Sequence, residues 1–168
     1  FEINLSLAQG IQSNINERLL SLSRRYGLRP EDICIEITET AANFAPSITK
    51  KNLEGLSSLG FPIAMDDFGT GYSNFGNFME IPFQMVKLDR SLIMGMERSR
   101  NGLVGLEMLV GMFKNMGTEI VAEGIETESQ LETVRKLGID LIQGFYFARP
   151  MPADKFRAFL LERARICT

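Results

Sequence analysis

Two adjacent carboxylates, Asp66 and Asp67, stand between an apolar run and a glycine-rich loop, within the stretch AMDDFGTGYSNF at residues 64–75. The apolar residues before them are typical of a buried strand. Gly69 and Gly71 supply loop positions where a positive φ or a close backbone approach costs little. Parallel α/β folds place active sites at the carboxyl ends of their strands, which favours a functional site here. An isolated Asp-Asp-Phe-Gly is equally typical of a turn in which an Asp caps the following backbone.

Other polar side chains lie near the ends of apolar segments along the chain. Each has an ordinary explanation when taken alone: Glu36 fits the wet face of an edge strand, and Lys87 fits a surface position. Their occurrence at equivalent points of successive segments instead indicates that these side chains line one common site at the carboxyl ends of the strands. The full set comprises Asn4, Glu36, Asp66, Asp67, Lys87, Glu123 and Gln143.

The 168-residue chain contains no histidine. This excludes Ser-His-Asp and Cys-His catalysis, imidazole general bases and ordinary histidine-based zinc sites. Carboxylate, amide and lysine chemistry is what remains. Oxygen ligands of that kind prefer hard cations such as Mg²⁺ or Mn²⁺ over zinc or copper.

Net charge and cysteine content limit which partners the protein can bind and which cellular compartment suits it. A net charge of −3 and a pI near 5.1 give no global basic field for binding duplex nucleic acid. Cys34 and Cys167 make neither a disulfide framework nor a zinc knuckle, so a reducing, cytoplasmic compartment is the simplest interpretation. The sequence has no apolar run of about 18 residues. We therefore expect a soluble domain, although a longer parent protein can still carry a membrane anchor.

Strand-like and helix-like patterns alternate six times, which predicts a parallel β/α array. An eight-unit barrel typically needs about 250 residues, so six units predict an incomplete TIM-like barrel that lacks its first two strands. We expect strands at residues 1–6, 33–38, 61–67, 84–89, 119–124 and 140–147. We expect helices at residues 8–26, 47–59, 75–81, 103–116, 128–137 and 153–165.

Several motifs resemble, in order, those of the EAL-domain phosphodiesterases that hydrolyse cyclic di-GMP. They are NLS at 4–6, EITET at 36–40, DDFGTGYS at 66–73, KLDRS at 87–91, AEGIET at 122–127 and QGFYFARP at 143–150. The stretch DDFGTGYS is specific by itself, and the ordered set leaves little room for chance. The resemblance covers nearly all of the chain but only about the last two-thirds of the family domain, so residues 1–168 are expected to form a single domain of this type.

The resemblance implies a modified TIM barrel with two bound ions, Mg²⁺ or Mn²⁺, and hydrolysis of cyclic di-GMP to linear pGpG. In the two-metal scheme a carboxylate such as Asp66 bridges the ions, which activate water and stabilise the displacement at phosphorus. Lys87 would orient or activate the attacking water beside Asp66 and Glu123, and Gln143 would complete the surroundings of the water and metal. The metal ligands implied are Asn4, Glu36, Asp66, Asp67 and Glu123.

Glu39 follows Glu36 by three residues and has two interpretations. By resemblance it anchors the loop at residues 68–75, through Thr70 or the backbone N–H groups of that loop. Alternatively, it is a solvated carboxylate or one at the start of a helix.

The sequence departs from the family at one point, because it contains no Glu-Ala-Leu tripeptide. We expect the corresponding ligand and two leading strands to come from the parent protein or a second chain, and little hydrolysis by these residues alone. Alternatives are a cyclic di-GMP receptor or regulatory module without turnover, an inactive fragment, and an unrelated metal-dependent barrel. A homodimer and attached sensory domains are the further partners we expect.

Overall fold

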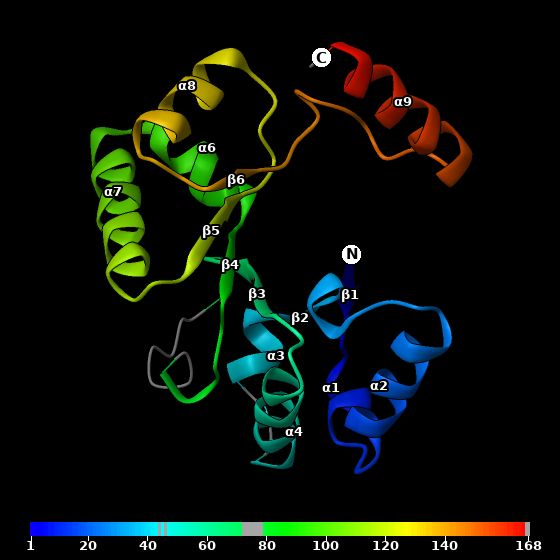
Figure 1. The fold of residues 1–168 in the computed structure, drawn as a ribbon. Coiled ribbons are helices and arrows are strands. Elements are labelled where there is room, and N and C mark those ends of the chain that lie inside the picture. The colour runs from blue at the N-terminus through cyan, green and yellow to red at the C-terminus, as the bar shows by residue number, and fades with distance from the viewer. Residues whose placement is uncertain (44, 46, 72–78, 167–168) are drawn as a thin grey trace.

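The computed structural model describes residues 1–43, 45, 47–71 and 79–166 of the chain. Its centre is a parallel sheet in which every strand pairs with the next strand along the sequence. The sheet curls into a half-barrel with helices around it (Figure 1), which confirms the predicted incomplete TIM-like barrel. The strands are β1 (Glu2–Asn4), β2 (Cys34–Thr38), β3 (Ile63–Phe68), β4 (Met85–Leu88), β5 (Glu119–Ala122) and β6 (Leu141–Ile142).

The apolar core lies between the sheet and the helices that pack on it. Strand residues such as Ile35, Ile63 and Val86 have no exposed surface. Phe113 of a helix meets Phe68 of β3 edge to face, with ring centroids 5.1 Å apart. The helices are α1 (Leu7–Gly10), α2 (Ile15–Arg25), α3 (Glu39–Asn43), α4 (Ser47–Ser58), α6 (Arg90–Arg98), α7 (Arg100–Asn115), α8 (Glu128–Lys136) and α9 (Ala153–Ile166), with a 3-10 turn at Pro30–Asp32.

The helix predicted at residues 8–26 is wrong as a single element, because the chain breaks between α1 and α2. Ser6 caps α1 in a capping box with Gln9. The side-chain amide of Asn52, on α4, then donates to the carbonyl oxygens of Gly10 and Gln12, at 2.7 and 3.1 Å. This contact from a distant helix satisfies carbonyls that a continuous helix would have used itself.

The other differences concern short elements. Helix α6 was not predicted; Asp89 caps it by accepting a hydrogen bond from the backbone N–H of Ser91 at 2.8 Å. The short helix α3 was not predicted either. Strand β6 is much shorter than the strand predicted at residues 140–147, because the chain turns after Gln143 and the N–H of Phe147 donates to the carbonyl of Gly144. The helix predicted at 75–81 falls largely on residues 72–78, which lie outside the described residues.

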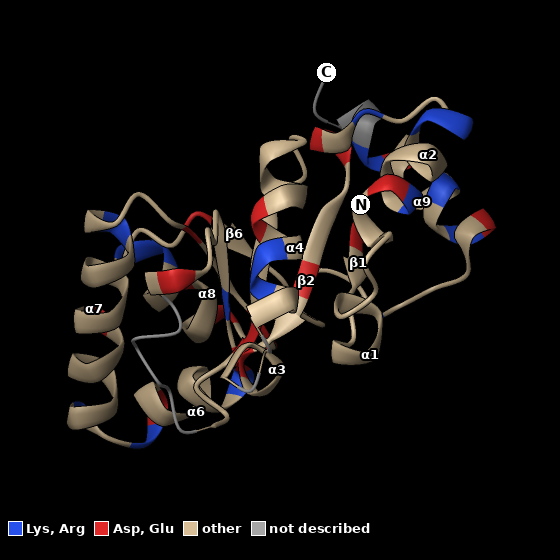
Figure 2. Ribbon diagram, turned by 90° about the horizontal axis from the view of Figure 1, so that it is seen from below, with Lys and Arg blue, Asp and Glu red and all other residues tan. Residues whose placement is uncertain are grey.

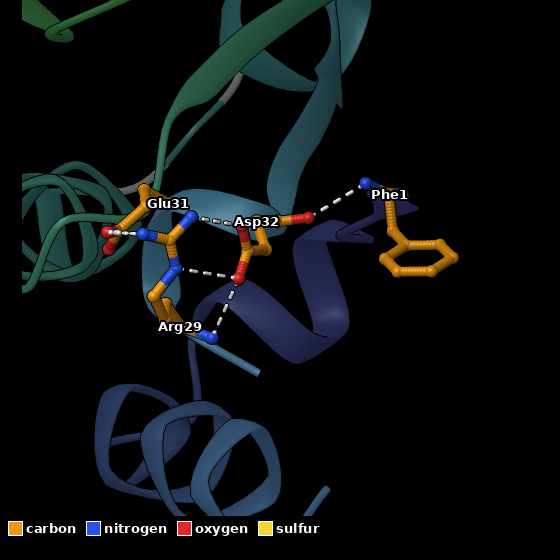
Figure 3. A network of polar contacts seen from close by, with 4 residues as sticks. All are labelled: Phe1, Arg29, Glu31 and Asp32. Atoms are coloured by element: carbon orange, nitrogen blue, oxygen red, sulfur yellow. Dashed lines mark hydrogen bonds and ion pairs between the residues drawn. The ribbon is translucent and has the colours of Figure 1, made fainter. Parts of the chain in front are cut away.

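A polar network fixes the turn that leads into β2 (Figure 3). The Asp32 carboxylate accepts hydrogen bonds from the Arg29 backbone N–H and guanidinium. The amino group of Phe1 donates to the Asp32 carbonyl oxygen at 2.8 Å, and the N–H of Cys34 donates to the Phe1 carbonyl. These contacts join β1 to the start of β2. Within the described ranges, no helix combines the length and apolar character needed to cross a bilayer.

Candidate metal centre

A β-bulge lies at the carboxyl end of β3. Met65 pairs with Val86 and Phe68 with Leu88, so three steps along β3 match two steps along β4. Asp67 falls inside this irregularity and has a positive φ of 56°. In a regular strand, adjacent side chains point to opposite faces. The bulge relaxes that alternation and lets two neighbouring carboxylates face one site.

Three carboxylates gather at this bulge. One oxygen each from Asp66, Asp67 and Glu123 lies within 4.8 Å of the others, and all three residues are partly buried. Glu123 comes directly after β5, and its N–H donates to the carbonyl of Leu88 at 3.1 Å. The predicted meeting of strand ends is therefore present for these three side chains.

Lys87 lies among the carboxylates and connects them. Its Nζ is 2.6 Å from Glu36 Oε1, 2.9 Å from Glu123 Oε1 and 3.1 Å from Asp66 Oδ1. The Lys87 and Glu36 side chains are only 6% and 5% exposed. Glu36 is the one charged residue of β2, on which Figure 2 marks an acidic segment in red. It joins the site through this lysine rather than lying on a wet edge.

Burial and mutual charge shift the pKa values of this site. Burial raises the pKa of Glu36 and Glu123, against the opposing effect of Lys87. Burial also raises the pKa of Asp67, helped by the negative charges of Asp66 and Asp89. Burial alone would lower the pKa of Lys87, but its hydrogen bond to Glu36 and the nearby carboxylates of Glu123 and Asp66 outweigh that effect and raise the pKa. The raised pKa favours the ammonium form of Lys87, which donates a hydrogen bond to Glu36.

The chemistry of these residues fits a divalent cation. Asp66 Oδ1 is buried and close to Lys87 Nζ, yet it accepts no hydrogen bond of good geometry from the described residues. A buried oxygen of this kind is costly unless another partner satisfies it. All the donors are carboxylate oxygens, the ligands that hard cations prefer.

Two further predicted site residues are the metal ligand Asn4 and the water-positioning residue Gln143. Asn4 pairs in register with Glu36, which puts the two side chains on the same face of the sheet. Asn4 lines a hollow of about 520 Å³ with Thr38 and Thr40. Gln143, whose N–H donates to the Ala122 carbonyl, lines another hollow of about 540 Å³. The role of Asn4 as a metal ligand and that of Gln143 in positioning water and substrate stay predictions.

The loop after Asp67 is held by hydrogen bonds at its start. Glu39, 1% exposed, accepts a hydrogen bond from the Gly69 N–H at 2.8 Å. The Thr70 hydroxyl and N–H both donate to the Asp67 carbonyl, at 2.9 and 3.2 Å. Glu39 therefore contacts the loop backbone, and its burial contradicts the solvated alternative.

Sequence reasoning passed over Arg90, although it lies inside the motif KLDRS. Arg90 Nη2 is 3.0 Å from Glu126 Oε2, in the loop that follows Glu123. It lines the same hollow as Gln143 and Arg149. The available signal was its position in the sequence, three residues after Lys87 and at the start of the helix that follows β4.

A parallel half-barrel with carboxylates gathered at the carboxyl ends of its strands defines a class of α/β domains suited to hard divalent cations. The chain belongs to the EAL domain family, whose model matches residues 1–150. This confirms the resemblance stated from the motifs.

Known proteins support this membership. Cyclic di-GMP phosphodiesterase RocR of Pseudomonas aeruginosa is 36% identical over 140 residues, covering 83% of this chain and 36% of RocR. The EAL domain of Mycobacterium smegmatis DcpA superposes with a TM-score of 0.88 at 29% identity, covering 96% of this chain and 72% of that one. Klebsiella pneumoniae BlrP1, in a manganese and cyclic di-GMP complex, gives a TM-score of 0.82 at 31% identity, covering 89% and 38%. The chain spans about a third or less of the length of the curated relatives it matches.

Proposed function

We propose that this protein hydrolyses cyclic di-GMP to linear pGpG with two bound Mg²⁺ or Mn²⁺ ions. The observation that carries the proposal is the cluster of Asp66, Asp67 and Glu123 within 4.8 Å, with the Lys87 ammonium 3.1 Å from Asp66 Oδ1. Relatives support the substrate and the metal, because RocR is named a cyclic di-GMP phosphodiesterase and the BlrP1 structure is a complex with manganese and cyclic di-GMP.

The residues divide into those that hold the ions and those that orient water. Bound ions of this kind polarise phosphoryl oxygens and lower the pKa of water. Lys87, whose Nζ is 3.1 Å from Asp66 Oδ1, would orient or activate the attacking water, while Gln143 would help to position water and substrate. The residues proposed to hold the ions are Asn4, Glu36, Asp66, Asp67 and Glu123.

The proposal extends to partners and compartment. Because the curated relatives are longer than this chain, we expect sensory or regulatory domains in the parent protein. A homodimer, a cytoplasmic site of action and the absence of duplex nucleic acid among the ligands are part of the same proposal.

Product analysis tests this function. The full-length protein is incubated with cyclic di-GMP and Mn²⁺, and the nucleotides are separated by reverse-phase chromatography. We expect pGpG from the wild type and from Glu54→Gln, an exposed control on α4, but not from Asp66→Ala. Calorimetric binding of cyclic di-GMP without any pGpG would instead identify a receptor, and absence of both would refute the assignment.

A further inference from the structure

Arg90, the first residue of α6, lies against the loop that carries Glu123. Its guanidinium pairs with Glu126, and Nη2 is 3.0 Å from Oε2. Its alkyl stem covers Gly124: a Cβ built on that glycine would lie 2.6 Å from both Cβ and Cγ of Arg90. Arg90 therefore contacts both Gly124, which directly follows Glu123, and Glu126.

Gly124 leaves no space for a side chain. Its φ is +70°, in the region that favours glycine, and the Arg90 stem fills the place of a Cβ. The backbone next to Glu123 is thus confined by packing as well as by an ion pair. Because Arg90 is half exposed, the ion pair alone contributes little, and the packing of the stem is the larger part of the contact.

The same loop is tied to α6 at a second point. The buried Gln130 side chain accepts hydrogen bonds from the N–H groups of Glu126 and Thr127, at 2.8 and 3.1 Å. Its amide nitrogen donates to Glu97 Oε2 at 2.8 Å. Helix α6 therefore holds this loop from Arg90 at one end and from Glu97 near the other.

We propose that Arg90 is a positioning residue, which keeps the Glu123 carboxylate beside Asp66 and Asp67 and so sets the affinity of the metal centre. The inference rests on the proposed function, since it assigns how that same site is held in place. Lys87 lies three residues before Arg90, so one short segment carries both the central cation and the support for Glu123.

Metal titration tests the inference without an activity assay. Mn²⁺ binding is measured by calorimetry for Arg90→Ala, Arg90→Met and the control Arg98→Ala, which changes an exposed arginine on the same helix. We expect about tenfold weaker binding for Arg90→Ala. Arg90→Met should lose less, because its unbranched stem still covers Gly124. Wild-type affinity in Arg90→Ala would overturn the inference.

Two glycines supply a matched second test. Gly124→Ala and Gly117→Ala introduce alanine at nearly the same φ, +70° and +73°, but nothing lies within 4 Å of a Cβ at Gly117. We expect Gly124→Ala to weaken Mn²⁺ binding, because its Cβ would lie 2.6 Å from Arg90 Cβ and Cγ, and Gly117→Ala to leave Mn²⁺ binding unchanged. Equal Mn²⁺ affinities of the two glycine variants would contradict the role of Arg90, whatever their stabilities.

Kinetics separate this inference from the proposed function. If Arg90→Ala raises the KM for cyclic di-GMP while its Mn²⁺ affinity stays at the wild-type value, Arg90 contacts substrate and the positioning role is wrong. If the wild-type protein binds Mn²⁺ but forms no pGpG, the proposed phosphodiesterase activity is refuted. The positioning role would then still be supported by weaker Mn²⁺ binding in Arg90→Ala.

Discussion

Lys87 Nζ lies 2.6 Å from Glu36 Oε1, although their strands, β4 and β2, are separated by β3. This buried ion pair crosses the width of one strand on the inner face of the half-barrel. Glu123 on the far side of β4 contacts the same ammonium at 2.9 Å. With Asp66 of β3 at 3.1 Å, one cation thus contacts carboxylates from β2, from β3 and from the residue that follows β5.

Lys87→Met should destabilise the metal-free protein by about 3 kcal/mol, because removing one partner of a buried pair leaves uncompensated charge. Added Mn²⁺ should recover part of that loss by neutralising the carboxylates. Urea unfolding with and without Mn²⁺ measures both effects. The control is Lys136→Met, which removes an exposed pair with Glu132 and should cost less than about 1 kcal/mol. Equal costs for the two lysines would contradict the buried network.

Asp67 combines a charge with a backbone conformation that most residues avoid, and two substitutions separate these properties. Asp67→Asn keeps a side chain that tolerates positive φ but removes the charge, so Mn²⁺ binding should weaken while the unfolding free energy stays nearly constant. Asp67→Ala should lose the same ion and about 1 kcal/mol more of stability. Calorimetric stoichiometry and urea unfolding check the pair. Two ions still bound in Asp67→Ala would remove Asp67 from the ligand set.

The strands and the carboxylates of the site were predictable because both follow local rules. An alternating pattern indicated β2 and a continuous apolar run indicated β3, and the ends of parallel strands must meet at one edge of a sheet. The bulge at Asp66 and Asp67 was not predictable, since it exists only in the pairing of β3 with β4. The same is true of the contact between Lys87 and Glu36, which are 51 residues apart in the sequence.

Another error has the same physical origin. The break after Gly10 depends on Asn52, a residue on another helix. Helix α6 is a different kind of error, because its signals were local. Its buried residues Ile93 and Met96 stand at helical spacing, and Asp89 is a readable cap at its start. Local patterns therefore predicted the order of strands and helices. Tertiary contacts decided where the first predicted helix is interrupted and how the side chains of the site are arranged.

The turn before β2 should respond to acid. Side-chain and backbone hydrogen bonds from Arg29 lower the pKa of Asp32 from 3.8 to about 2. The ionised form is the stabilised one, so its contribution is complete above pH 3.8 and is lost as the pH falls toward 2. The stability difference between wild type and Asp32→Asn should therefore be smaller at pH 3 than at pH 6. In an Arg29→Met background this pH dependence should become smaller but remain, because the backbone N–H of residue 29 still donates to Asp32; an unchanged pH dependence would assign the effect to another group.

Glu39 can serve two structural roles. It is the first residue of α3, and its side chain accepts a hydrogen bond from the Gly69 N–H. If only the helix start matters, substitutions should change stability and leave the metal centre alone. If Glu39 anchors the loop, they should change metal affinity, because Gly69 is two residues from Asp67. Burial of the carboxylate favours the anchor, since a buried acceptor that is lost leaves a donor unsatisfied.

We therefore expect Glu39→Ala to weaken Mn²⁺ binding and cyclic di-GMP hydrolysis by about 10- to 100-fold, with the fold retained. Glu39→Gln keeps an oxygen acceptor of the same reach, so it should lose less than Glu39→Ala. Glu54→Gln, on the exposed side of α4, is the control and should match wild type. Calorimetry with Mn²⁺, product analysis and circular dichroism are applied to all three variants. Wild-type metal affinity in Glu39→Ala together with reduced thermal stability would show that Glu39 serves only the start of α3.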